Sequence, residues 1–577
     1  MPISARPASI AQRLLPILNW LPGYRRDWLL PDVLAGLAVW AVMVPESMAY
    51  AGIIGVPPIM GLYTIVPPLI AYALLGTSRL LVVGPDTATG LISALTVGAI
   101  AVSGTAEFNT LTSTLAILVG AFFLLFGALR MGWVAAFIPT PVMRGFIEGL
   151  VCVTIIGQVP HLLGINGTGG NFFTKLWFVL QHLPDASLAP ALTGLLSLIG
   201  MLLLRHLAPR LPAALVVAVA ATILVGLFNG EAAGVHVVGN LPSGLPHLVL
   251  PNLDPEKLRD LVPGALAIVL VGYAEALGAA KAAALQGGGE IDPNQELIAH
   301  GPANILSGLF GGFLVVGSLS KTSVAMAAGA RTQLANLVAA VFCFLTLVLL
   351  TPLFRGMPLP ALAAIVIAAM LHLSKPGYLR DLFARSRPEF AVAAIVIAGE
   401  LALGVLQGIA VGVVLALLML IYRTSHPRGA VLGQLPGQEA YRNVNRHPEA
   451  LTFPGLLIWR AGGDLFFASI GHLDEELKAA LAASRPPIKH ILLDADSVNF
   501  IDTSACDVLS NVIKQLQSQG ITFAFARVRD SVRERMRFGG VEAALEPGNF
   551  YERVTDGVRA WQQRGGVGAA AAAPTRQ

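Results

Sequence analysis

The chain has 577 residues, of which 55% are hydrophobic and only 12% are charged, and its mean hydropathy is +0.70. Ordinary soluble proteins are about 25% charged, so this composition excludes a chain that is soluble throughout and indicates an integral membrane protein. The formal net charge of +4 fits basic loops on one side of a membrane. Because no basic cluster with interleaved aromatic residues occurs, no nucleic-acid partner is expected.

Residues 1–30 are predicted to form a cytoplasmic or interfacial N-terminal segment. The apolar part of this segment is interrupted by Pro16, Pro22 and the pair Arg25 and Arg26. No small-residue cleavage site follows, so the segment is not expected to be a secretory signal.

Residues 31–425 are predicted to form a transmembrane domain of about fourteen spans, about seven in each of two repeats (31–228 and 260–423). The candidates at 87–102 and 321–330 are shorter than the roughly 20 residues that a crossing needs, which predicts half-helices. With the N-terminus inside, the basic loops fall on the cytoplasmic side, and an even number of spans places both termini there. The expected location is a bacterial inner (plasma) membrane.

An internal repeat supports this division into halves. "LLVVGPDTAT" occupies 80–89 and "FLVVGSLSKT" occupies 313–322, while Glu46 and Glu275 lie at matched places before them. A charged side chain at the centre of a span costs about 2.5–3.5 kcal/mol or more, so two matched glutamates indicate a function. An odd number of spans per half inverts the second half, and inverted repeats with interrupted helices are typical of secondary transporters with a midplane site.

The two repeat motifs are suited to binding an anion. Each begins with β-favouring residues and a glycine, and then offers residues suited to helix N-caps: Asp86 or Thr87 in the first, Ser318 or Ser320 in the second. Backbone N–H groups at a helix start are unpaired and carry partial positive charge. Two half-helix starts that face each other would therefore form an anion site made largely of backbone.

Lys321 adds a full positive charge at the second half-helix, and Glu46, Asp86 and Glu275 are the nearby carboxylates in the predicted arrangement. A buried carboxylate takes up a proton more readily when it loses water and less readily beside a lysine. We therefore hypothesise that Glu275, together with Glu46, couples proton uptake to anion entry.

Simpler interpretations of the same residues remain open. Asp86 can act only as an N-cap, Ser318 and Ser320 can merely satisfy the backbone, and Lys321 can form a permanent structural bridge with a glutamate. Both glutamates can be inert, and Tyr50 can be a packing residue.

Other polar residues in the membrane part are given no role in binding. Arg144 and Glu148 are one turn apart and are interpreted as an internal pair. The three cysteines provide neither a metal site nor a disulfide framework. Four histidines of the membrane part also lack metal-ligand spacing: His161, His206, His236 and His247. No metal, no cofactor and no catalytic residue is therefore expected, and the chain is not expected to be an enzyme.

Four motifs that occur in order resemble the SulP family of anion transporters. They are "DVLAGLAVWAVMVPESMAYAGIIGVPPIMGLY" (32–63), "GTSRLLVVGPDTA" (76–88), "IDPNQELIAHGPANILSGLFGG" (291–312) and "GSLSKTSVAMAAGARTQLANLV" (317–338). The resemblance implies an α-helical polytopic membrane protein with a seven-plus-seven inverted repeat, divided into gate and core subdomains. It also implies substrates such as sulfate, bicarbonate, chloride or dicarboxylates.

The family site lies between the third and tenth spans, with help from the first and eighth. Together with the half-helix starts, this resemblance implies a substrate-binding set of Glu46, Tyr50, Asp86, Thr87, Ser318, Ser320, Lys321 and Thr322. It also places Glu275, in the eighth span, at the site, which agrees with the hypothesis that Glu275 and Glu46 couple transport to a proton or another cation.

The sequence departs from the family pattern at two positions. Many members have Gln where Glu46 stands, and Arg where Lys321 stands. A carboxylate at the first position favours cation or proton coupling. Lysine is a point charge rather than a bidentate fork, so recognition of the anion is expected to depend more on backbone.

The expected function is secondary active transport of a small anion, with sulfate first, by proton symport. The alternatives are a bicarbonate or dicarboxylate transporter coupled to sodium, a passive exchanger or channel of the same fold, and a signalling protein. The expected partners are the anion, the proton or sodium, the lipid bilayer and a second copy of the chain in a homodimer.

The C-terminal part is more charged and resembles a STAS domain, a small α/β module, over 441–560, after a linker at 426–440. The stretch 454–469 predicts a strand pair with a Gly-Gly turn, and 488–528 predicts strand, loop, helix and strand. In "IDTSA" (501–505), Ser504 stands where soluble relatives are phosphorylated, which implies a regulatory site, whereas a module for docking and folding is the simpler interpretation. The tail, 561–577, is of low complexity and is predicted to be disordered.

Overall fold

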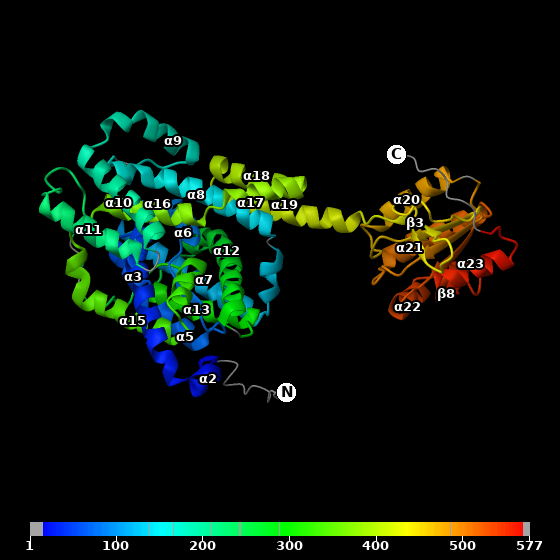
Figure 1. Cartoon of the computed structure of the whole chain (residues 1–577), viewed down its shortest axis with the longest axis horizontal. Helices are drawn as coiled ribbons and strands as arrows, with labels where there is room; N and C mark the ends of the chain where they lie inside the picture. The colour runs from blue at the N-terminus through cyan, green and yellow to red at the C-terminus, as the bar shows by residue number, and fades with distance from the viewer. Residues whose placement is uncertain are drawn as a thin grey trace. The chain divides into compact units, whose positions relative to one another are not determined.

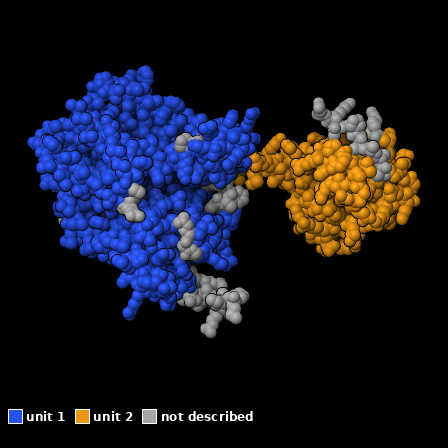
Figure 2. All heavy atoms as spheres, in the orientation of Figure 1, with its two compact units in different colours: residues 1–416 blue, residues 417–577 orange. Residues whose placement is uncertain are grey.

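The computed structural model describes residues 15–568, except 138, 166, 209–210, 240, 242–243, 288 and 485. The chain divides into two compact units, residues 1–416 and 417–577, which Figure 2 shows in different colours. The first unit consists mainly of helices, and the second is built around a sheet of six strands (Figure 1). Residues 1–14 of the predicted N-terminal segment lie outside the described residues.

The first unit begins with the short helices α2 (Ile17–Trp20), η1 (Leu21–Gly23) and η2 (Arg26–Trp28). The helices of its first half are α3 (Leu29–Ile54), α4 (Pro58–Tyr63), α5 (Val66–Leu75), α6 (Thr87–Gly98), α7 (Ala106–Ala128), η3 (Gly132–Phe137), α8 (Thr140–Leu163), α9 (Phe172–Gln181), η4 (Leu183–Asp185), α10 (Leu188–Leu207) and α11 (Ala213–Leu227).

The helices of the second half are α12 (Pro255–Gly287), α13 (Pro293–Leu309), α14 (Leu319–Ala327), α15 (Leu334–Leu345), η5 (Thr346–Leu350), η6 (Thr351–Phe354), α16 (Leu359–Leu373), α17 (Pro376–Arg385), α18 (Arg387–Leu403) and α19 (Val405–Ser425). Within the described part of the chain, eight helices are long and apolar enough to cross a membrane. The expectation of a polytopic membrane protein therefore agrees with the structure.

The two predicted half-helices are present at the two repeat motifs. Strand β1 (Val82–Gly84) leads into α6, and strand β2 (Val316–Ser318) leads into the nine-residue α14. The strands pair antiparallel, so that Val82 lies opposite Ser318. The chain therefore enters the two half-helices in opposite directions, as an inverted repeat requires.

Small residues allow α7 and α13 to pack closely. A Cβ atom on Gly120 would lie 2.6 Å from the carbonyl oxygen of Gly301, and one on Gly308 would lie 2.4 Å from that of Ser113. Close contact between helices through glycine is typical of membrane proteins, where lipid supplies no hydrophobic drive between helices.

The buried carboxylate of Glu296 in α13 ties the second half of the unit to the first. It accepts hydrogen bonds from Tyr72 Oη at 2.7 Å, from the backbone and hydroxyl of Thr77 at 2.9 and 2.5 Å, and from Ser78 N at 3.3 Å. These donors precede β1, so Glu296 fixes the entry to the first half-helix.

Asp32 in α3 makes the reciprocal connection from the first half to the second. Its carboxylate is fully buried and accepts from Arg331 N at 2.6 Å, Thr332 N at 3.1 Å and Thr332 Oγ1 at 2.7 Å. The segment that follows α14 is thereby held against α3.

The second unit contains a mixed sheet in the order β4-β3-β5-β6-β7-β8, with parallel pairing from β5 onward. Its elements are β3 (Ala430–Gln434), β4 (Tyr441–Asn443), β5 (Leu456–Arg460), α20 (Ile470–Ala483), β6 (His490–Asp494), α21 (Thr503–Ser518), β7 (Thr522–Ala526), α22 (Asp530–Phe538), η7 (Glu542–Ala544), β8 (Phe550–Tyr551) and α23 (Val554–Gln563).

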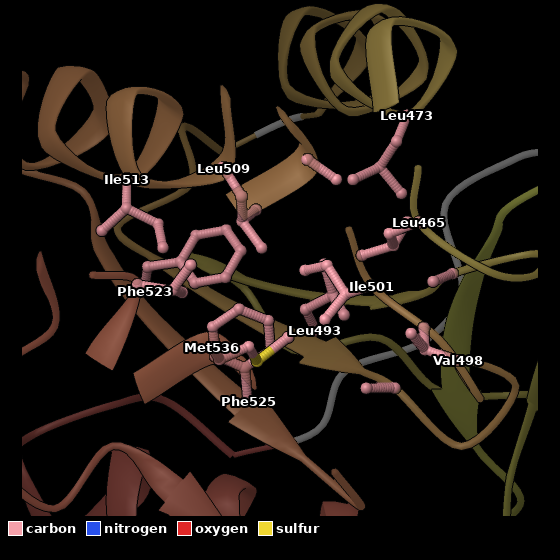
Figure 3. Packing of buried hydrophobic residues seen from close by; sticks show 14 of the residues in the cluster. Leu465, Leu473, Leu493, Val498, Ile501, Leu509, Ile513, Phe523, Phe525 and Met536 are labelled. Atoms are coloured by element: carbon pink, nitrogen blue, oxygen red, sulfur yellow. The ribbon is translucent and has the colours of Figure 1, made fainter. Parts of the chain in front are cut away.

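Side chains alternate between two apolar layers on the faces of this sheet. Leu493 of β6 and Phe523 and Phe525 of β7 pack beneath α20, α21 and α22, as Figure 3 shows in part. Their neighbours Leu492 and Ala524 face the opposite layer, which α23 covers. Burial of both faces explains why these strands are almost continuously apolar.

Three expectations for this unit need correction. The stretch 454–469 forms the single strand β5 rather than a strand pair, because Leu465 makes only an isolated bridge to Ile501. β3 lies inside the segment predicted as a linker, where its pairing with β5 outweighs the polar surroundings. The predicted disordered tail overlaps the last turn of α23, which ends at Gln563, and residues 569–577 lie outside the described residues. The predicted order of strand, loop, helix and strand over 488–528 is confirmed by β6, α21 and β7.

Removing the charge of Glu296 is expected to destabilise the first unit. Hydrogen bonds to a charged group contribute about 1.5–3 kcal/mol each, so Glu296→Gln should lower the melting temperature of the purified chain in detergent, and Glu296→Ala should lower it further. Glu290→Gln, which changes an exposed residue, is the control and should melt like the wild type. Equal melting of all four proteins would contradict a stabilising role for Glu296.

The stability of the second unit is expected to fall as the pH falls from about 6.5. His490 in β6 is 4% exposed, and its burial, followed by the Arg564 charge, lowers its pKa to about 4. The unfolded chain then binds a proton that the folded unit excludes, so the free energy of unfolding should drop by about 1.4 kcal/mol per pH unit between these values.

Denaturant unfolding of the second unit across this pH range checks the slope. His490→Gln should remove this part of the pH dependence, whereas His447→Gln, at a partly exposed site, should leave it. An unchanged slope in His490→Gln would show that another group is responsible.

Candidate functional site

The centre of the candidate site is an ion pair buried within the first unit. Lys321 Nζ lies 3.3 Å from Glu46 Oε2, and the two side chains are 2% and 6% exposed. The ammonium also donates to the carbonyl oxygen of Pro85 at 2.9 Å and lies 5.1 Å from the centre of the Tyr50 ring. Lys321 thus joins α14 to α3 and to the start of α6.

Glu46 and Tyr50 lie one turn apart on α3 and present their polar groups to this lysine. Tyr50 Oη is 3.5 Å from Glu46 Oε2. Pro45 precedes Glu46 inside the helix, and because proline has no N–H group, it interrupts the backbone ladder at this depth.

At the start of α6, Asp86 acts as the N-cap. Its Oδ2 accepts from Ala88 N at 2.8 Å and from Thr89 N at 3.2 Å. This carboxylate therefore already occupies first-turn donors that a bound anion would otherwise use. The next residue, Thr87, is 1% exposed, and its hydroxyl lies next to the hydroxyl of Tyr50.

At the start of α14, the hydroxyl groups of Ser318 and Ser320 lie 3.2 Å apart, and Ser318 caps the helix by accepting from Lys321 N at 3.5 Å. Thr322 has a different arrangement. Its hydroxyl donates to Ser318 O at 2.6 Å and accepts from Val82 N at 3.0 Å. Thr322 is thus engaged in holding α14 against β1.

Glu275 completes the set from α12, which packs against α6, β2 and α14. It is half-buried and interacts electrostatically with both Asp86 and Lys321. The structure therefore groups three carboxylates with Lys321: Glu46 contacts the ammonium directly, Glu275 interacts with it electrostatically, and Asp86 follows Pro85, whose carbonyl the ammonium contacts.

Arg205 is a further cation near this set, and the sequence motifs do not single it out. It lies near the end of α10, interacts electrostatically with Tyr50 and donates to Ala368 O at 2.8 Å. Nothing in the local sequence relates α10 to α3, so only the tertiary packing identifies it. With Arg205 included, carboxylates still outnumber cations by three to two.

Two other sequence interpretations can be compared with the structure. The predicted pair of Arg144 and Glu148 is wrong, because Glu148 accepts from Ser374 Oγ at 2.5 Å and from Lys375 N at 2.6 Å, while Arg144 lies over the Tyr378 ring. These partners come from a segment distant in sequence, which one-turn spacing does not reveal.

Ser504 belongs to the second unit, whereas the site lies within the first unit. It is exposed in the first turn of α21. Asp502 caps the helix through Ala505 N at 2.7 Å, so the serine hydroxyl is not needed as a cap. Within the described part of the chain, no group of three or more His, Cys, Asp or Glu residues could hold a metal ion.

Comparisons with known proteins agree for both units. Residues 29–396 match the sulfate permease family, and residues 447–557 match the STAS domain. A Mycobacterium tuberculosis protein named "Probable sulfate transporter" is 34% identical over 557 residues, covering 95% of this chain and 99% of its own. The Arabidopsis thaliana protein named "Sulfate transporter 4.1, chloroplastic" is 30% identical, covering 95% and 82%.

Solved structures share the fold. The murine Solute Carrier 26 family member A9 anion transporter in its inward-facing state aligns with a TM-score of 0.88 at 24% identity, covering 97% of this chain and 96% of that one. The transmembrane domain of a cyanobacterium bicarbonate transporter aligns with a TM-score of 0.61 at 23% identity, covering 67% and 98%.

The family match extends over more than half of the chain, and the relatives align along nearly its whole length. The chain is therefore a multi-pass anion transporter of the sulfate permease family, with a C-terminal STAS domain.

Proposed function

We propose that this chain is a secondary active transporter that moves a small anion, with sulfate first, together with protons. The single observation that carries this proposal is the excess of carboxylates around Lys321. With Glu46, Asp86 and Glu275 ionised, the site repels an anion even when Arg205 is counted. Protonation of the carboxylates removes this repulsion, so anion binding and proton uptake favour each other.

In this mechanism, Glu46 and the anion compete for the same ammonium group. Protonation of Glu46 breaks the attraction that holds Lys321 and frees a cation for the guest. The hydroxyl groups of Thr87, Ser318 and Ser320, of which that of Thr87 is almost fully buried, then supply hydrogen bonds. Release of the proton from Glu46 restores the ion pair and expels the anion.

Glu275 takes the second coupling role, and Asp86 the role of a fixed negative charge. Asp86 is held by hydrogen bonds from the backbone at the start of α6. Glu275 accepts no such bonds from described residues, and we assign it the uptake of the second proton.

The second candidate is sodium-coupled transport of bicarbonate or a dicarboxylate. Carboxylate, carbonyl and hydroxyl oxygens are the ligands that a hard cation prefers, and Asp86, Pro85 and Glu275 offer such groups near Lys321. Bicarbonate is named for this candidate because a bicarbonate transporter shares the fold. The third candidate is passive exchange of anions by a protein of the same fold.

We also propose the arrangement in the cell that the sequence implies. The chain lies in a bacterial inner membrane as a homodimer, with both termini in the cytoplasm. Ser504 serves as a regulatory phosphorylation site because it is exposed at the start of α21, where a phosphate would meet the positive end of the helix dipole.

Uptake of radiolabelled anions by the purified full chain in liposomes tests the function. Sulfate should accumulate against its gradient when the outside is acidic, and a sodium gradient alone should not drive it. Bicarbonate and dicarboxylates complete the panel. Accumulation of one of these under a sodium gradient would select the second candidate, and equilibration without accumulation would select passive transport.

Substitution of the glutamates separates their roles. Glu46→Gln frees Lys321 at neutral pH, so sulfate should bind about tenfold more tightly, which corresponds to about 1.4 kcal/mol, while proton-driven accumulation is lost. Glu275→Gln should also lose accumulation driven by the pH gradient. The matched control is Glu400→Gln, which changes a fully buried glutamate in α18 next to Gly149 and Gly408, and it should keep coupling. Full pH dependence in Glu275→Gln would exclude a coupling role for that residue.

A further inference from the structure

A separate cavity of about 180 Å³ lies between α8 and α9 on one side and the end of α3 and Leu91 of α6 on the other. Figure 1 shows α9 beside α8, against which it packs. The residues that matter for its chemistry are Gly52, Leu91, Thr154, Gln158, His161 and Lys175. None of them belongs to the set around Lys321.

The side chains that line this cavity offer one cation and several hydrogen-bond donors. The residues that line it include no Asp or Glu among those described. Lys175 extends from α9 over Gly157 of α8, since a Cβ atom on Gly157 would lie 3.7 Å from Lys175 Nζ. Thr154 is 3% exposed, and its hydroxyl has no partner among the described residues.

The ammonium group of Lys175 is partly removed from water without compensation. Desolvation lowers the pKa of Lys175, and no carboxylate opposes that shift. A bound anion would offset this cost, because an opposite charge favours the charged form of a lysine. The buried Thr154 hydroxyl would gain the acceptor that it lacks.

The position of the cavity relates it to the central site. α3 carries both Glu46 and Gly52, and α6 carries both Thr87 and Leu91. At 1.5 Å per residue, the cavity lies about 6–10 Å along these helices from the central site. α14 runs from that site in the opposite direction, so with a cytoplasmic N-terminus the cavity lies toward the outer face.

We propose that this cavity is an outer capture site for the transported anion, a small oxyanion such as sulfate. Lys175 supplies the charge, and Thr154, Gln158 and His161 supply hydrogen bonds. The site rests on the proposed function, since it is a stage on the path to Lys321. Capture by a cation in a narrow cavity raises the local concentration of the anion before the central site opens to it.

A cysteine next to Lys175 provides a direct test that does not require transport. Gly157→Cys is introduced into the full chain with Cys152→Ser, which removes the exposed native cysteine, while Cys343 and Cys506 are buried. Methanethiosulfonate reagents carrying either a sulfonate or an ammonium group are applied, with and without sulfate. The sulfonate reagent should react about tenfold faster than its cationic counterpart, and sulfate should slow it.

Adding Lys175→Gln should abolish both the preference for the sulfonate and the protection by sulfate, and Lys175→Arg should keep them. Lys257→Gln is the matched control, because this lysine begins α12 and is already paired with Glu107 at 2.5 Å. Labelling that is indifferent to reagent charge, to sulfate or to Lys175 would overturn the capture site.

Uptake by the same proteins distinguishes failure of this site from failure of the function. Lys175→Gln should raise the KM for sulfate applied from the outer side about tenfold and leave the maximal rate and the KM for efflux unchanged. Sulfate protection without uptake in the wild type would support the site and refute the transport proposal. Uptake with an unchanged outer KM in Lys175→Gln would refute the site and leave the transport proposal standing.

Discussion

The contact between Lys321 and Glu46 is the constraint on which the rest of the membrane unit depends. Burying two charges away from water is costly, and deleting one partner of a buried pair is more costly still, because the other charge is then left buried without a partner. Their 3.3 Å separation therefore holds α14 against α3 as long as both are ionised. In the proposed mechanism, an anion that enters must either replace Glu46 as the partner of Lys321 or wait until Glu46 is neutral.

Hydrogen bonds around this contact hold the two half-helices in fixed positions relative to each other and to α3. The hydroxyl group of Thr322 joins α14 to β1, and the antiparallel pairing of β1 with β2 brings the two half-helix starts together. Glu296 and Asp32 anchor the segments before β1 and after α14 from opposite halves of the repeat. Each of these bonds satisfies backbone that would otherwise be unpaired inside a membrane.

The main features of this arrangement could be predicted because they have strong local signals. Glutamate and lysine stand out inside apolar spans, and the repeated motif marks two breaks in the helices, which the structure has at α6 and α14. The sequence could not show which carboxylate contacts Lys321, nor that Thr322 and Glu296 would hydrogen-bond to groups of the other half of the repeat. Those choices depend on contacts between residues more than 200 positions apart, as the bonds from Val82 to Thr322 and from Tyr72 to Glu296 illustrate. The predicted strand pair at 454–469 was wrong for a related reason: alternation describes a possible strand, and only a neighbouring strand makes it one.

The number of protons taken up when the anion binds tests the central claim most directly. Calorimetric titration of the full chain with sulfate, in buffers of different ionisation enthalpy at one pH, gives that number without transport or mutation. If the carboxylates around Lys321 must be neutralised before the ammonium can hold an anion, about one proton or more will be taken up per sulfate bound. Binding of sulfate with no proton uptake across neutral pH would contradict the account.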